Sequence, residues 1–333
     1  MKTNRSSFST RTRLLLNGIL FVLCLAPGVY TTGAEKTAIA GRLAPALKSQ
    51  AAGLGREQCS IDPEFKGRPA GLREGDQVRV YTSSNGVALF TVRFNTEKAG
   101  DKNLIRMTAQ GRKRIGLEKS HGQRIHLRTP VIRPGITEEE ARQQNEFIEL
   151  LEAEASPIPK TVHLLILAPH GGSIEPGTDI IGRRILAAPS LKHSAVLWAC
   201  LGFRAGGGAY TRWHITSTDI SEQSFPKLGK LAESGRTFLN AIAIHGHRGD
   251  AILIGGAGNT QIKDMLRKEL NKQIPSVKIH ILEKKDRLSG FSSRNIVNRY
   301  SKNGIQIELP MTVRKNKWKE TADAIIAVFK KKP

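Results

Sequence analysis

LLILAPHGGSIEPGT, residues Leu164–Thr178, is an apolar run that ends in a histidine, two glycines and a glutamate. An apolar run stopped by proline and glycine is typical of a buried strand that enters a loop. Ligands bind at the carboxyl ends of strands in open α/β sheets, and His170 and Glu175 stand at that end. Imidazole and carboxylate are both zinc ligands. The stretch also fits a glycine-rich turn from strand to helix with a capping carboxylate, so by itself it leaves both interpretations open.

The composition is that of a basic globular protein. A chain of 333 residues, with 39% hydrophobic and 24% charged residues, can bury a substantial core as one large or two modest domains. Its formal net charge of +23 is unusually high and predicts an acidic partner, such as an anionic polymer, lipid or nucleic acid. Nucleic-acid binding is not expected, because aromatic residues make up only 5% of the chain and no recognisable module is present.

The first 34 residues predict a signal peptide. Four basic residues precede the apolar run Leu14–Leu25, and small residues suited to cleavage follow it. The run is too short and too interrupted for a good membrane span, so we expect residues 1–34 to be removed and the protein to be secreted or periplasmic, without a stable membrane span. An uncleaved anchor is the alternative. The mature chain keeps Cys59 and Cys200, which form either one disulfide or two unrelated thiols.

Two regions precede the stretch quoted above. Residues 35–58 are predicted to be a linker, with a short helix at Ala38–Gln50 as an alternative. Residues 59–135 are predicted to be a small all-β barrel, because short runs such as Gln77–Tyr81 alternate apolar and polar positions between turns. The sequence GLREGDQVRV, which begins at Gly71, recurs loosely as IGLEKSHGQRIHL, which begins at Ile115. The pair resembles the two halves of a double-psi β-barrel, a small closed all-β domain.

Residues 136–159 are predicted to form a helical connector, because Thr137 and Glu140 have the spacing of a capping box and an apolar stripe follows. Over residues 160–333 the pattern changes to strand–helix alternation. That pattern predicts an α/β domain whose mostly parallel sheet is flanked by helices. The expected strands are 162–168, 194–200, 213–217, 239–244, 251–255, 277–282 and 304–309, and the expected helices are 179–188, 225–235, 260–272 and 316–331.

Two later strands carry further side chains of the same chemistry. The strand Leu239–Ile244 is followed by the sequence HGH, which begins at His245, and the strand Gly304–Leu309 places Glu308 near its end. A carboxylate in an apolar run is costly to bury unless it is paired or used. The sheet can therefore present two histidines and a glutamate to a zinc ion, with a fourth position open and a second glutamate as general base. This is the arrangement of a catalytic zinc site.

Six motifs occur in order between residues 160 and 315: APHGGSIEPGT, HITST, AIHGHRGD, a Gly-Gly pair, RNIVNR and GIQIEL. Together they resemble the poly-γ-glutamate hydrolase family. Its members are zinc-dependent depolymerases of bacteria and phages and are related in fold to the zinc carboxypeptidases. The resemblance implies that His170, Glu175 and His245 bind Zn²⁺. It also implies that Glu308 is the catalytic carboxylate. The residues that it implies for substrate binding are His214, Arg294 and Asn295.

The leading hypothesis is a secreted zinc-dependent hydrolase that cleaves γ-glutamyl amide bonds of poly-γ-glutamate. The net positive charge would attract this anionic chain. The alternatives are a zinc amidase or peptidase acting on cell-wall peptide and a non-catalytic basic protein that binds polyanions. His247 is a second candidate for the position assigned to His245. The barrel is not part of the minimal phage-type enzyme, so the resemblance assigns it no role.

Overall fold

The computed structural model describes residues 39–48, 53–69, 71–95, 101–119, 121–153, 158, 162–235 and 237–330. Residues 36–333 form one compact unit. The predicted signal peptide, residues 1–34, lies outside the described residues. Within the described part of the chain, no helix is both long and apolar enough to cross a membrane.

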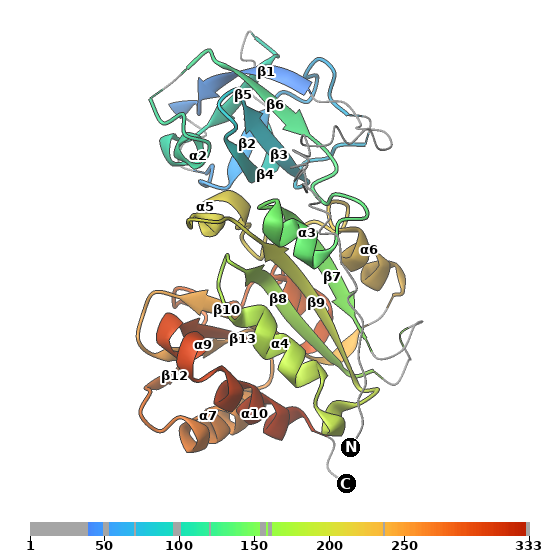
Figure 1. The fold of residues 1–333 in the computed structure, drawn as a ribbon, viewed down its shortest axis with the longest axis vertical. Coiled ribbons are helices and arrows are strands. Elements are labelled where there is room, and N and C mark those ends of the chain that lie inside the picture. Colours follow the sequence, from blue (N-terminus) through green and yellow to red (C-terminus); the bar gives the residue numbers. More distant parts are fainter. Residues whose placement is uncertain are drawn as a thin grey trace, which may run out of the picture. The chain divides into compact units, whose positions relative to one another are not determined.

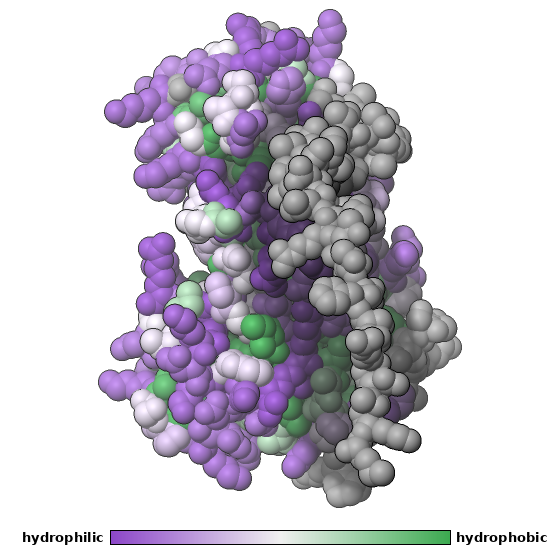
Figure 2. All heavy atoms as spheres, viewed as in Figure 1, coloured by the Kyte–Doolittle hydropathy of each residue, from purple (hydrophilic) through white to green (hydrophobic). Residues whose placement is uncertain are grey.

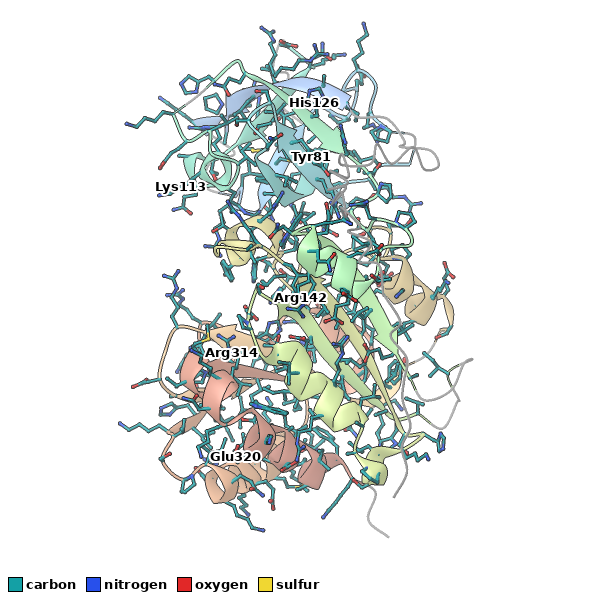
Figure 3. The ribbon with its side chains drawn as sticks, in the orientation of Figure 1. Tyr81, Lys113, His126, Arg142, Arg314 and Glu320 are labelled. Carbon is teal, nitrogen blue, oxygen red and sulfur yellow. The ribbon has the colours of Figure 1, made fainter. Side chains whose placement is uncertain are left out.

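The N-terminal part of this unit is a closed six-stranded barrel, as the sequence predicts (Figure 1). The order of neighbours around it is β1-β5-β2-β4-β3-β6. The two loosely repeated sequences end in β3 and β6, which pair antiparallel and bring Tyr81 opposite His126 (Figure 3). The barrel elements are β1 (Ile39–Pro45), β2 (Gln58–Ile61), β3 (Gln77–Thr82), β4 (Val87–Phe94), β5 (Leu104–Met107), α2 (Ala109–Arg114) and β6 (Arg124–Arg128).

The linker predicted for residues 35–58 is wrong where it overlaps β1. Residues 39–45 pair with β5 on one side and β6 on the other, and so close the barrel. Ile39 and Leu43 are buried in its core, and a Cβ at Gly41 would lie 2.7 Å from Phe65. The local sequence of this short strand does not predict its secondary structure, because the strand depends on pairing partners that lie far along the chain.

The C-terminal part is a seven-stranded sheet in the order β12-β11-β13-β10-β8-β9-β7. The four pairings β11–β12, β13–β10, β10–β8 and β8–β9 are parallel, whereas β11–β13 and β7–β9 are antiparallel, so the prediction of a mostly parallel sheet is confirmed. Its strands are β7 (Phe147–Glu152), β8 (Leu164–Gly172), β9 (Ala195–Gly202), β10 (Phe238–His247), β11 (Ile252–Gly255), β12 (Ile279–Ile281) and β13 (Ser301–Pro310).

Helices cover both faces of this sheet, because the central strands are apolar on both sides. Along β8, Leu164 and Ile166 face the core under α4, α7 and α10, whereas Leu165 and Leu167 face the core under α5, α6 and α8 (Figure 1). The helices are α3 (Glu138–Gln143), α4 (Thr178–Leu186), α5 (Ala209–Trp213), α6 (Pro226–Glu233), α7 (Thr260–Gln273), α8 (Ile296–Arg299), α9 (Met311–Asn316) and α10 (Trp318–Phe329), with a 3₁₀ turn at Pro189–Leu191.

The helical connector predicted for 136–159 is only partly helical. The capping box at Thr137 begins α3, but that helix ends at Gln143, and Asn145 then adopts a positive φ of 57°. The next residues form the edge strand β7, antiparallel to β9. The buried Glu149 stabilises the strand over a continued helix. Its carboxylate accepts the indole N–H of Trp198 at 2.8 Å and caps the start of α6 by accepting two backbone N–H groups.

Hydrophilic side chains cover most of the coloured surface on the face drawn in Figure 2, in keeping with the high net charge. Cys59 in β2 and Cys200 in β9 are both buried free thiols. The structure therefore favours two unrelated cysteines over a disulfide. Burial raises the pKa of Cys59 to about 12, so this thiol is unreactive as a nucleophile.

Candidate metal centre

His170 projects from a bulge near the carboxyl end of β8. In the pairing of β8 with β9, Ala168 is opposite Ala199 and Gly171 is opposite Leu201, so β8 contains one extra residue. Bulges of this kind turn a side chain away from the regular alternation and occur next to active sites. The bulge directs the His170 ring into a buried space, where Nε2 lies 2.9 Å from the backbone oxygen of Ile215.

The two glycines after His170 allow the strand to approach its neighbours closely. A Cβ at Gly171 would lie 2.4 Å from Leu201 and 2.8 Å from Asp179. Gly172 has a φ of 66°, which L-residues rarely adopt, and its N–H donates to the Asp179 carboxylate at 3.0 Å. Close packing therefore requires a glycine at position 171, and the backbone conformation favours one at position 172.

We expect Gly171→Ala to destabilise the protein by about 1–3 kcal/mol, because the added methyl group overpacks a buried contact. A lower midpoint of thermal or urea unfolding would reveal the loss. Gly55→Ala is the matched control, since a Cβ there meets only ordinary contacts of 3.6 Å and more. Equal stability of the two variants would contradict the close packing at Gly171.

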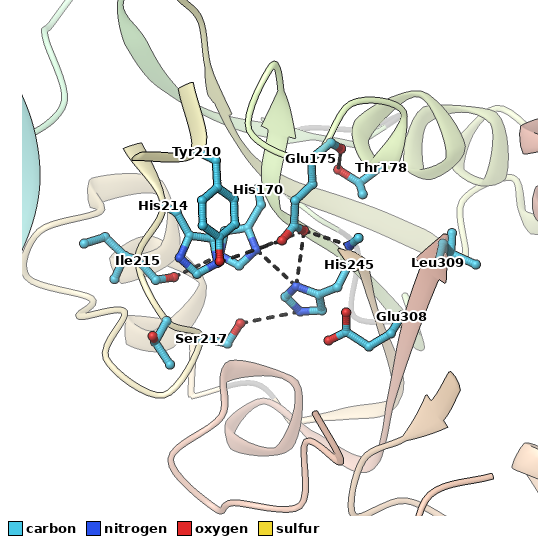
Figure 4. Close-up of polar contacts among 12 residues, drawn as sticks. His170, Glu175, Thr178, Tyr210, His214, Ile215, Ser217, His245, Glu308 and Leu309 are labelled. Atoms are coloured by element: carbon cyan, nitrogen blue, oxygen red, sulfur yellow. Dashed lines mark hydrogen bonds and ion pairs between the residues drawn. The ribbon is translucent and has the colours of Figure 1, made fainter. Parts of the chain in front are cut away.

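Glu175 returns to His170 through a short turn. Its backbone N–H donates to the His170 carbonyl at 2.8 Å, and its own carbonyl accepts from the Thr178 hydroxyl at 3.1 Å. Gly177, with a φ of 97°, is the N-cap residue that precedes α4. This turn places the Glu175 carboxylate Oε2 3.2 Å from Nδ1 of His170, both side chains being buried (Figure 4).

Arg314 of α9 connects the Glu175 turn to the end of β13. Its guanidinium donates to the carbonyl of Pro176 at 2.6 Å and to that of Leu309 at 3.2 Å. A Cβ at Gly246 would lie 2.5 Å from Cζ of Arg314, so a larger residue would displace the guanidinium. The Gly246 N–H donates to Glu175 Oε2 at 2.8 Å and holds that carboxylate in the site.

His245 and Glu308 lie side by side because β10 and β13 pair in parallel with these residues in register (Figure 4). Burial, together with the charge of Glu175, raises the pKa of Glu308 well above its ordinary value. Gln306 donates to Glu308 Oε1 at 2.9 Å, and Asn295 donates to the Gln306 amide oxygen at 2.8 Å. The carboxyl therefore has a fixed orientation and an affinity for protons suited to acid–base catalysis.

Three possible ligand atoms converge at this point. The distances are 3.2 Å between His170 Nδ1 and Glu175 Oε2, 3.1 Å between the Nδ1 atoms of His170 and His245, and 3.7 Å between His245 Nδ1 and Glu175 Oε2. Ligand atoms about 2.0–2.1 Å from a tetrahedral zinc ion are about 3.3–3.4 Å apart. The triangle therefore has the dimensions of three zinc ligands.

The hydrogen bonds of the imidazoles agree with this interpretation. The Ile215 carbonyl can only accept, so His170 Nε2 carries a proton and, in the neutral ring, Nδ1 has a free lone pair facing Glu175. Either a proton on Nδ1 or a metal ion between the two atoms would satisfy both acceptors. Burial alone would lower the pKa of His170, but the Glu175 charge outweighs it and raises that pKa, so this pair favours a positive charge between its members, whereas burial lowers the pKa of His245. The residues present fit a zinc ion.

The segment 214–217 lies against this cluster as its outer layer. The sequence predicted a strand at 213–217, but α5 ends at Trp213 and the following residues join no sheet. The Ile215 carbonyl contacts His170, and the Ser217 hydroxyl lies 3.5 Å from His245 Nε2. His214 also enters the site: ligand atoms of His170, Glu175 and His214 lie within 4.8 Å of one another.

Arg294 borders a cavity of about 320 Å³ lined from both the barrel and the sheet domain. Its guanidinium contacts Asp219 at 3.0 Å, and Arg93 contacts the same carboxylate oxygen at 2.8 Å. The cavity therefore carries a partly balanced positive charge. Its charged lining residues are Arg73, Arg93, Arg294, Arg299, Glu74, Asp219 and Glu222.

The remaining candidates, Asn295 and His247, contact neighbouring residues of the fold and do not enter the triangle of ligand atoms. Asn295 is buried, caps α8 by accepting the Val297 N–H at 3.1 Å, and supports Glu308 through Gln306. Both ring nitrogens of His247 are engaged within its own loop, at 2.8 Å from the Ala251 carbonyl and 3.1 Å from the Gly249 N–H. The structure thus places His245, and not His247, beside His170.

The sequence region that forms this cluster matches a known family. A family model described as poly-gamma-glutamate hydrolase matches residues 152–325, more than half of the chain. The chain belongs to the poly-gamma-glutamate hydrolase family. The prophage-derived protein YoqZ of Bacillus subtilis is 30% identical over 186 residues, which cover 53% of this chain and 61% of YoqZ. The chain thus spans less than two thirds of this curated relative.

Two solved structures are similar to this member of the poly-gamma-glutamate hydrolase family. A bacteriophage poly-gamma-glutamate hydrolase is 21% identical, with a TM-score of 0.43 over 55% of this chain and 87% of that one. The zinc-free form of YndL is 22% identical, with a TM-score of 0.43 over 58% of this chain and 95% of that one. The barrel, residues 39–128, precedes the region that the family model matches.

Proposed function

We propose that the protein is a secreted, zinc-dependent hydrolase that cleaves γ-glutamyl amide bonds of poly-γ-glutamate. The observation that carries this proposal is the buried triangle of His170, Glu175 and His245 with Glu308 on the adjacent strand, in a member of this hydrolase family. A zinc ion held by the triangle would supply Lewis-acid chemistry, which lowers the pKa of water and polarises a carbonyl group.

Glu308 performs the proton transfers in this proposal. Its ionised carboxylate accepts a proton from the attacking water and then donates that proton to the leaving amine. Gln306 holds Oε1, which leaves Oε2 for the proton transfers. Burial raises the pKa of Glu308, and this higher pKa makes the carboxylate a stronger base for the attacking water. It also makes the protonated carboxyl available to donate to the leaving amine.

The charge distribution supports an anionic polymer as substrate. Removal of the four basic residues of the signal peptide leaves a net charge of +19 out of +23, which attracts a polyglutamate chain over long range, and salt weakens this attraction. The arginines of the cavity beside Arg294 can pair with carboxylates of the chain. Secretion is supported by the sequence of the first 34 residues, in which four basic residues precede an apolar run and small residues follow it.

Cleavage assays on matched polymers test the proposal. Purified protein with stoichiometric zinc should shorten poly-γ-glutamate, seen by size-exclusion chromatography, and release one new amine per bond cleaved. Poly-α-glutamate has the same charge but a different linkage and should stay intact. Degradation of cell-wall peptide alone would identify the amidase alternative. Binding of both polyglutamates without cleavage would indicate the non-catalytic polyanion-binding alternative.

A further inference from the structure

A carboxylate from the barrel reaches the outer layer of the metal centre. Glu57 immediately precedes β2, and its backbone carbonyl accepts the Thr91 N–H of β4 at 2.8 Å, so the barrel fixes its position. The side chain is buried and contacts the segment 214–217, which lies 157 residues away along the chain. Glu57 lies outside the residues that the family model matches and within the linker that the sequence predicted.

The Glu57 carboxylate has a donor for each oxygen. Oε1 lies 2.7 Å from Nδ1 of His214, and Oε2 accepts the backbone N–H and the hydroxyl of Thr216, both at 2.9 Å. Burial alone would raise the pKa of Glu57, but the hydrogen bonds from His214 and Thr216, with the charge of Arg114, lower it to about 2. Glu57 is therefore ionised and can only accept hydrogen bonds.

Two further barrel residues hold the same segment. Arg114 of α2 donates to the carbonyls of Thr211 and His214, at 2.7 and 2.9 Å. Arg56 donates to the hydroxyl of Tyr210 at 2.6 Å, and the Tyr210 ring stacks on His214 with ring centres 4.3 Å apart. The barrel thus holds the imidazole through Glu57 and the Arg56-bound Tyr210, and it holds the His214 backbone through Arg114.

This arrangement decides which face of His214 meets the metal centre. Because an ionised carboxylate can only accept, His214 Nδ1 carries a proton and points to the barrel. In the neutral ring Nε2 then keeps its lone pair and points inward, 3.9 Å from Glu175 Oε1. A histidine at a metal site commonly donates its other ring N–H to a carboxylate, which sets its tautomer and orientation.

We propose that Glu57 is a positioning residue of the hydrolase reaction, and that the barrel is part of the catalytic unit because it orients the His214 ring toward the metal centre. This inference rests on the proposed function. It gives the barrel a role at the reaction centre itself, through contacts that the sheet domain alone cannot make.

Glu57→Gln is a sharp test, because it changes the tautomer while preserving the volume. Two donors at Glu57 cannot switch their roles: the backbone N–H of Thr216 at 2.9 Å from Oε2 and Nε of Arg56 at 3.3 Å from Oε1. The shorter Thr216 contact selects the amide oxygen, and the amide NH₂ then faces His214 Nδ1. The proton of His214 has to move to Nε2. We expect kcat on poly-γ-glutamate to fall on the order of 10–100-fold, with a much smaller change in KM and with zinc content unchanged.

The nitrogen spectrum of the histidine rings gives a readout independent of activity. In full-length mature protein labelled with ¹⁵N-histidine, His214 should carry its proton on Nδ1 in the wild type and on Nε2 in Glu57→Gln. Glu64→Gln is the matched control, because it removes an equal charge from an exposed barrel carboxylate whose ion-pair partner is Lys102. The control should change neither kcat nor the His214 signals.

Either of two results would overturn the inference: a wild-type His214 protonated on Nε2, or a Glu57→Gln variant with the kcat of the wild type. The first needs no variant, so it decides the question even if Glu57→Gln fails to fold. A wild-type protein that binds zinc but leaves poly-γ-glutamate intact would instead refute the proposed function. In that case the nitrogen spectrum still decides whether Glu57 sets the His214 ring.

Discussion

Glu308→Gln is expected to lower kcat on poly-γ-glutamate by about 10²–10⁴-fold, the usual contribution of a general acid–base group. Glutamine has the same shape but cannot accept the proton of the attacking water or return it to the leaving amine. Oε1 already accepts from Gln306, so the amide oxygen can take that position without disturbing the strand. The measurement is steady-state kinetics beside zinc content by elemental analysis.

Zinc should remain stoichiometric in Glu308→Gln, because the three proposed ligands belong to other residues. Stability should not fall either, since burial of the ionised carboxylate is unfavourable and its pKa is raised. A variant with near-normal kcat would show that another group acts as the base. Loss of zinc together with activity would place Glu308 among the metal ligands.

His170→Ala is expected to abolish stoichiometric zinc binding and, with it, polymer cleavage. His170 contributes Nδ1 as one corner of the triangle, 3.1 Å from His245 Nδ1 and 3.2 Å from Glu175 Oε2. Its loss leaves two ligands from this set, and an open catalytic zinc site normally has three from the protein. Elemental analysis after dialysis against limiting zinc gives the result directly.

His247→Ala is the matched control for this experiment. His247 follows the same strand as His245, but its ring nitrogens contact only its own loop. This variant should keep zinc and activity. Zinc loss in His247→Ala with zinc retained in His245→Ala would reverse the assignment of the third ligand. Absence of zinc in the wild type, even after zinc is added, would refute the metal centre as a whole.

The main elements of the sheet domain could be predicted because their signals are local. Apolar runs with a proline, glycine or histidine at their ends mark β8, β10 and β13, and parallel strands bring their carboxyl ends to one edge. His170, His245 and Glu308 therefore had to lie near one another. Their predicted proximity holds in the structure, with His245 directly opposite Glu308.

The two wrong predictions, a helix over residues 147–152 and a linker over residues 39–45, have a common physical cause. Residues 147–152 resemble a helix in their apolar spacing, yet they form an edge strand because β9 offers a pairing partner and Glu149 finds donors at Trp198 and α6. Residues 39–45 resemble a linker, yet they close the barrel between β5 and β6. In both cases the deciding partners lie elsewhere in the chain, where a local pattern carries no information about them.

The sequence by itself determined the chemical groups of the centre and the strand ends that deliver them, because both depend on residue type and on short-range periodicity. Only the tertiary structure decided how those groups are held. The Ile215 carbonyl that orients His170 is 45 residues from it, and the Glu57 carboxylate that orients His214 is 157 residues from it. Hydrogen bonds depend on distance and direction in space, and chain folding alone brings such partners together.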